Sequence, residues 1–123
     1  MRVALIALFG AIGTLARYGL QGIVQAKTGP GFPSGTLVVN VSGCLLLGFL
    51  GQLTLNRMVL SPDMRVAMTI GFFGGYTTFS SFGWETVKMF EDGNWVYAGI
   101  YVASSLLVGL AFMFLGIHAA NRI

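Results

Sequence analysis

The stretch from residue 71 to residue 83 decides how this chain folds, and it reads Gly-Phe-Phe-Gly-Gly-Tyr-Thr-Thr-Phe-Ser-Ser-Phe-Gly. It lies inside an apolar segment, yet glycine costs about 1 kcal/mol relative to alanine in a helix interior, and β-branched threonine adds to that cost. The Gly-Gly pair at 74–75 and the Thr-Thr pair at 77–78 therefore predict two half-helices that meet near Tyr76. In lipid, non-helical backbone persists only where protein buries it or where it faces a water-filled cavity. The break indicates either a site or a packing kink without a ligand.

The composition places the chain in a lipid bilayer. Of its 123 residues, 55% are hydrophobic and 9% are charged, and the mean hydropathy is +0.80. Such a chain cannot form the polar surface that a soluble domain needs. We expect a single transmembrane domain over residues 1–123, with the lipid bilayer and no nucleic acid as a partner. The single cysteine, Cys44, excludes an intrachain disulfide and a cysteine-based metal site.

Four apolar segments predict four transmembrane helices, at about residues 3–24, 35–56, 64–90 and 95–118. The first segment begins like a signal peptide, but its apolar run continues past Gly13 without a convincing cleavage site, so we interpret it as a span. The predicted fold class is an all-α integral membrane protein whose third helix is broken in mid-span.

Polar side chains interrupt these spans. Arg17 lies well inside the first span, where a guanidinium must reach the interface, find a partner or serve an anion. Asn40, which shares a helix face with Thr36, either bonds a neighbouring helix or donates into a polar path. Glu85 and Lys88 are three residues apart, a spacing that favours a surface ion pair.

The cationic residues give only a weak preference for one orientation of the chain in the membrane. Four spans put both termini on one side, where the cationic residues are Arg2, Arg57, Arg65 and Arg122; those of the other side are Lys27, Lys88 and Arg17. A difference of four against three gives a weak positive-inside preference, so the chain can insert either way up. Two copies of opposite orientation can pair as an antiparallel homodimer, which resembles the inverted repeats of transporters.

The polar residues offer no catalytic constellation, because no carboxylate pair, activated nucleophile, phosphate loop or transition-metal cluster is present. They are mainly hydrogen-bond donors, namely the Asn40 amide and several hydroxyls. Phe79 and Phe82 add ring edges, which carry the positive part of the aromatic quadrupole. This set suits a small anion, although two core phenylalanines remain the alternative. Carbonyls freed by the break suit a hard monovalent cation.

Three motifs resemble those of the Fluc fluoride channels, also called CrcB proteins. They are Gly-Gly-Tyr-Thr-Thr-Phe-Ser-Ser-Phe at 74–82, Gly-Thr-Leu-Val-Val-Asn at 35–40 and Gly-Ala-Ile-Gly-Thr-Leu-Ala-Arg-Tyr at 10–18. The resemblance covers essentially the whole chain. It implies a dual-topology antiparallel homodimer in a bacterial cytoplasmic (inner) membrane. That dimer would export fluoride passively through two pores and hold a structural Na⁺ at its centre.

The resemblance also implies roles for residues of the anion pathway. Phe79 and Phe82 would be the aromatic pair that each chain contributes, and Asn40 the amide that lines the path. Tyr101 and Ser105 align with the pore tyrosine and serine of the family's fourth segment.

Further implied roles lie at the ends and the centre of the path. Thr36 and Glu85 would join a polar track near one pore end, and Arg17 would lie near an aqueous vestibule. The backbone carbonyls of Gly74 and Thr77 would hold the Na⁺.

Two other classes of protein fit the size of the chain. A small four-helix, dual-topology multidrug or proton transporter would be expected to carry a glutamate in its first segment, where this chain has Arg17. A non-transporting assembly subunit would need no broken segment. Ser81, Gly83 and Gly109 depart from residues frequent in the Fluc family, which affects the hydroxyl track rather than the resemblance.

Overall fold

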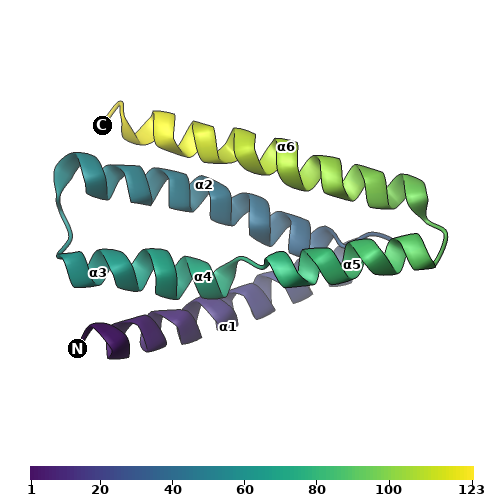
Figure 1. Ribbon diagram of the computed structural model, residues 1–123, viewed down its shortest axis with the longest axis horizontal. Coiled ribbons are helices and arrows are strands. Elements are labelled where there is room, and N and C mark those ends of the chain that lie inside the picture. The colour runs from purple at the N-terminus through teal and green to yellow at the C-terminus, as the bar shows by residue number, and fades with distance from the viewer.

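The structure, a computed structural model, describes residues 1–123 and is entirely helical (Figure 1). Three helices are long, and four shorter elements occupy the third apolar segment. The long helices are α1 (Arg2–Thr28), α2 (Ser34–Arg57) and α6 (Trp95–Ala120). The third segment consists of α3 (Pro62–Val66), the π-helix η1 (Ala67–Phe72), α4 (Phe73–Tyr76) and α5 (Phe79–Glu91). The predicted all-α fold and the predicted break are therefore confirmed.

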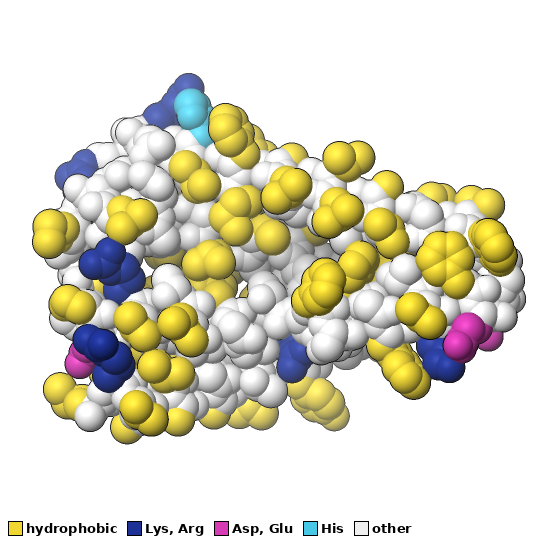
Figure 2. Space-filling model, viewed as in Figure 1, with side chains coloured by type: hydrophobic (Ala, Val, Ile, Leu, Met, Phe, Trp, Pro, Cys, Tyr) yellow, Lys and Arg dark blue, Asp and Glu magenta, His cyan; other side chains and the backbone are white.

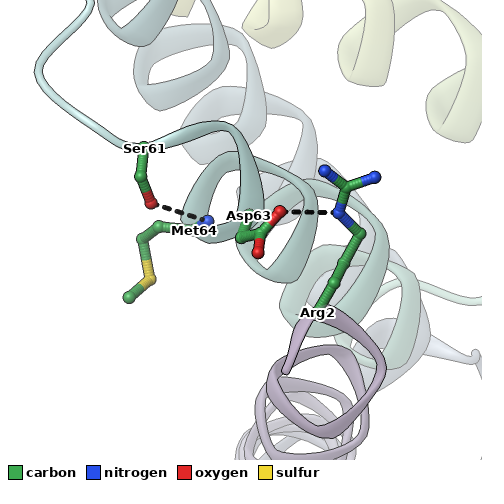
Figure 3. Close-up of polar contacts among 4 residues, drawn as sticks. All are labelled: Arg2, Ser61, Asp63 and Met64. Carbon is green, nitrogen blue, oxygen red and sulfur yellow. Dashed lines mark hydrogen bonds and ion pairs between the residues drawn. The ribbon is translucent and has the colours of Figure 1, made fainter.

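The long helices α1, α2 and α6 are each long and apolar enough to cross a membrane. The third segment contains no single helix of that length, because it is divided at Thr77. It also begins two residues earlier than predicted, at Pro62. Proline at the first helical position and the Ser61 hydroxyl, which accepts a hydrogen bond from the Met64 amide, explain this start (Figure 3).

Both termini lie at one end of the molecule (Figure 1). At that end Arg2 Nε donates to Asp63 Oδ1 over 2.7 Å, which ties the start of α1 to α3 (Figure 3). Figure 2 shows lysine and arginine side chains gathered at the same end. Because both partners are solvent-accessible, this ion pair contributes little to stability.

The broken segment changes its packing partner along its length. Its first half, η1 and α4, lies against α1, whereas α5 lies against α6, and α2 packs along α6 throughout (Figure 1). Glycines bring α1 and the first half into backbone contact. A Cβ atom on Gly13 would overlap the Phe72 carbonyl, and one on Gly75 would lie 2.6 Å from the Gly10 carbonyl oxygen. Contact of this kind is how helices associate without a hydrophobic driving force.

Candidate functional site

The break consists of Thr77 and Thr78, one to two residues after the position predicted for it. Thr77 has φ −87° and ψ 160°, and Thr78 has φ −150° and ψ 116°, so both residues are extended. In a continuous helix the Thr78 amide would donate to the Gly74 carbonyl. Here it donates to a side chain of α2 instead. The break therefore leaves the Gly74 carbonyl without its helical donor, while the Thr77 amide still donates to the Phe73 carbonyl over 3.0 Å.

Asn40 of α2 makes two hydrogen bonds to the backbone of the break through its side-chain amide. Its Nδ2 donates to the Thr78 carbonyl over 2.9 Å, and its Oδ1 accepts from the Thr78 amide over 2.8 Å. The buried peptide groups of Thr78 are thus satisfied, as buried backbone requires. An amide NH₂ has two donor hydrogens, so one remains for a further acceptor. Of the two alternatives for Asn40, a bond to a neighbouring segment is therefore present, and the remaining N–H leaves the polar path open as well.

The second half-helix begins directly at the break. Thr78 caps α5, since its Oγ1 accepts from the Ser81 amide over 3.2 Å. The same hydroxyl donates to Ser81 Oγ over 3.0 Å. The N-terminus of α5, which carries a partial positive charge, is therefore located at the break.

A cavity of about 240 Å³ opens beside the break and brings four of the residues predicted for the anion pathway together. These four are Asn40, Phe79, Phe82 and Ser105, and the rest of the wall is Gly43, Cys44, Leu47, Thr77, Thr78, Leu106 and Met113. Ser105 Oγ is buried and has no hydrogen-bond partner in the chain. An amide, a free hydroxyl and two aromatic rings therefore share one wall.

The two phenylalanines of this cavity differ in burial. Their ring centroids are 5.7 Å apart. Phe79 is 82% exposed, so the alternative that it is a core residue is wrong. Phe82 is partly buried and packs on the ring of Tyr101 at 5.2 Å.

Three other predicted residues form a second polar cluster next to Phe82. Glu85 accepts from the Thr36 hydroxyl over 2.7 Å and from the Tyr101 hydroxyl over 2.6 Å. Thr36 and Tyr101 are fully buried. The surface ion pair between Glu85 and Lys88 is wrong, because Glu85 faces these two hydroxyls inside the helix bundle. Lys88 pairs instead with Glu91 on the exposed side, over 2.6 Å.

Arg17 lies apart from both clusters. It is half-buried on α1 and lines a separate cavity of about 490 Å³ with Thr14, Tyr18, Gln21, Gly22, Gln25 and Ser81. It makes no salt bridge within the chain. Of the alternatives for this guanidinium, an intrachain partner is therefore wrong. Ser81 is the residue that this cavity shares with the capped start of α5.

The carbonyls of Gly74 and Thr77, predicted to hold a monovalent cation, belong to the last turn of α4 and to the break. The Gly74 carbonyl has lost the Thr78 amide as its helical donor, and the Gly74 residue is exposed, with nothing within 4 Å of the position of a Cβ. No group of three or more His, Cys, Asp or Glu side chains could hold a metal ion. Carbonyls of unwound helices are the groups that coordinate Na⁺ in transporters. Two oxygens from one chain are too few for a full coordination shell.

Sequence reasoning missed residues of α2 that hold the break in place. Ser42 Oγ lies 2.8 Å from Tyr76 Oη, and a Cβ atom on Gly43 would overlap Thr77 Cγ2. Their partners lie more than thirty positions away in the sequence. No local pattern could have identified these contacts.

Comparison with known proteins identifies a family that matches nearly the whole chain. The family model described as CrcB-like protein, Camphor Resistance (CrcB), matches residues 4–117. A protein of Nitratidesulfovibrio vulgaris is 46% identical, with 99% of this chain and 98% of that protein aligned. A protein of Geobacter metallireducens is 46% identical, with 100% of this chain and 99% of that protein aligned. A protein of Acidithiobacillus ferrooxidans is 50% identical, with 87% of each chain aligned. All three are named fluoride-specific ion channel FluC. On the family match and these identities, the chain belongs to the CrcB family.

Proposed function

We propose that this chain conducts fluoride passively across a membrane along a path that passes the break at Thr77 and Thr78. The observation that carries the proposal is the cavity beside the break, where the Asn40 amide, the unpartnered Ser105 hydroxyl and the Phe79 and Phe82 rings meet. The names of the relatives support fluoride as the ion. The chain is a multi-pass membrane protein of an ion-channel family and not an enzyme.

The cavity offers fluoride neutral donors in place of its water shell. The remaining Asn40 N–H, the Ser105 hydroxyl and the positive ring edges each replace part of the hydration. No lysine or arginine lines this cavity, so binding stays weak enough for release, as conduction requires. Because the small ion approaches fixed donors most closely, a narrow path of this kind favours fluoride over chloride.

Glu85, Thr36 and Tyr101 form the end of the proposed path. The protons of both hydroxyls are already donated to the Glu85 carboxylate. This cluster therefore fixes the Tyr101 ring against Phe82 rather than supplying free donors along the path. We expect Arg17, in its separate cavity, to attract fluoride toward the vestibule.

The functional unit we propose is an antiparallel homodimer of four-span chains with two pores in the bacterial cytoplasmic (inner) membrane. Phe79 is exposed and Gly74 lies open, so one chain alone leaves one side of the break uncovered. A second copy related by a twofold axis would cover it and add two more carbonyls to those of Gly74 and Thr77. Those four oxygens would then hold a structural Na⁺, whose charge offsets the cost of bringing an anion to that depth.

A fluoride electrode tests the proposed function on purified protein reconstituted into liposomes loaded with fluoride or chloride. The expected result is rapid fluoride efflux with chloride retained. Liposomes that hold both ions would overturn the proposal and support a non-transporting subunit. Proton-coupled uptake of an organic cation without fluoride efflux would instead support a multidrug transporter. Mass measurement in detergent and labelling of each terminus from one side of the membrane test the dimer and its two orientations.

A further inference from the structure

Residues 40–43 of α2 face the break over its whole length. Asn40 bonds Thr78 at both its amide nitrogen and its oxygen. Two residues further along α2, Ser42 Oγ lies 2.8 Å from Tyr76 Oη, and the next residue, the buried Gly43, lies against Thr77. Every residue of the extended break and the last residue of α4 thus have a partner on this short piece of α2.

Gly43 makes the closest of these contacts. A Cβ atom there would overlap Thr77 Cγ2 and lie 3.3 Å from Tyr76 Cδ1. Thr77 cannot simply turn its methyl group away, because threonine is stiff at χ1 and its Oγ1 donates to the Phe73 carbonyl over 2.8 Å. A side chain at position 43 would therefore displace either the break or the end of α4.

We propose that Gly43 is a positioning residue for the fluoride path. Because position 43 has no side chain, Thr77 can pack directly against α2, and this brings Thr78 within hydrogen-bonding reach of Asn40. The inference rests on the proposed fluoride conduction and adds to it a residue that acts through the break. Gly43 lines the cavity, but it carries no donor for the ion.

The test is a steric rescue measured by fluoride efflux from liposomes, with elution volume in detergent as the measure of assembly. Gly43→Ala should lower the efflux rate about tenfold or more, as expected for an overpacked site. The double variant Gly43→Ala/Thr77→Ser moves one methyl group from Thr77 to position 43 and keeps the hydroxyl that bonds Phe73. It should recover the rate to within about threefold of the unmodified chain, since volume-conserving changes are tolerated best.

Two further variants separate the packing at position 43 from general effects. Gly43→Ala/Thr77→Val keeps the overlapping methyl group and loses the hydroxyl, so it should stay as slow as Gly43→Ala. Gly51→Ala adds the same methyl group to the same helix, where its nearest neighbour is Leu47 Cδ1 at 3.7 Å, and should conduct normally.

The possible results separate this inference from the proposed function. If the unmodified chain conducts no fluoride, the proposed function fails. If it conducts but Gly43→Ala conducts equally well, or if the serine and valine double variants behave alike, the role of Gly43 is overturned. Should Gly43→Ala fail to assemble, the two double variants decide the matter between them.

Discussion

The first half of the broken segment, which ends at Tyr76, packs on α1 through backbone atoms, whereas α5, which begins at Phe79, packs on α6 and exposes aromatic side chains. In the first half, Gly71 and Gly75 leave no room for a further methyl group where they meet α1. In the second half, Phe79 and Trp84 are 82% and 68% exposed. The first half therefore holds the position of the break, while α5 carries side chains that folding does not require. Changes in the two halves should separate stability from conduction.

The largest effect is expected from Gly13→Ala, which tests the contact on the side of α1. The new Cβ would overlap the Phe72 carbonyl, a backbone atom that cannot move without η1. We expect a loss of about 3 kcal/mol in the free energy of unfolding, because overpacking at backbone contacts is poorly accommodated. Denaturant titration in detergent measures it.

Gly19→Ala is the matched control for this prediction, since it lies on the same helix with nothing within 4 Å of its Cβ position. Equal stability of the two variants would show that the backbone contact between α1 and η1 is not tight.

Asn40→Asp changes the residue that bonds the break between the two halves. We expect a smaller loss of stability than for Gly13→Ala, together with complete loss of conduction. Aspartate keeps an acceptor for the Thr78 amide but loses the donor to the Thr78 carbonyl. The free energy of unfolding should fall by about 2 kcal/mol, the cost of one unsatisfied buried group. The added negative charge in the cavity should stop fluoride efflux.

Asn56→Asp makes the same chemical change at the exposed end of α2, where Asn56 bonds Asn121. It should conduct normally. Undiminished efflux through Asn40→Asp would place the fluoride path elsewhere.

Phe79→Ile tests α5, the second half of the broken segment. We expect this change to lower fluoride conduction and to leave the stability of the protein unchanged. Isoleucine keeps an apolar side chain at this exposed position but has no ring edge. Fluoride efflux should fall by about tenfold or more, and the unfolding midpoint should stay unchanged.

Phe114→Ile provides the comparison, because Phe114 is also exposed but lies on α6 and does not line the cavity. If both variants conduct equally, the ring edge of Phe79 has no role in the path.

The smallest effect is expected from Asp63→Asn, which removes the exposed ion pair with Arg2 at the start of the broken segment (Figure 3). The free energy of unfolding should change by about 0.5 kcal/mol or less, as for other exposed pairs. Fluoride efflux should be unaffected. A loss comparable to that of Gly13→Ala would mean that side chains rather than backbone contacts hold the first half.

The break was predictable from sequence because its causes are local. The Gly-Gly and Thr-Thr pairs at 74–75 and 77–78 disfavour a helix wherever the chain places them. The π-helix before the break was not predictable from sequence. In it the Phe73 amide donates to the Met68 carbonyl, five residues back, and nothing in the local pattern of Ala67–Phe72 specifies that bond.

The hydrogen-bond partners of Glu85 were also not predictable from local sequence. Spacing on one helix pointed to Lys88, but the carboxylate turns inward to hydroxyls that lie 49 and 16 residues away in the sequence. Contacts between distant segments follow from how the helices pack, and a single sequence does not reveal that packing. Asn40, Phe79 and Phe82 were grouped by residue type as groups suited to a small anion, and the family resemblance singled out Ser105 among the hydroxyls. The structure brings all four to one cavity.

The most direct test of the account is solid-state NMR of the protein in lipid bilayers, with labels on the Asn40 side-chain nitrogen and on Thr78. The account predicts extended backbone angles at Thr78 and a strong dipolar contact between Asn40 Nδ2 and the Thr78 carbonyl, matching the 2.9 Å hydrogen bond. Helical angles at Thr78, with its amide bonded to the Gly74 carbonyl and no contact to Asn40, would contradict it.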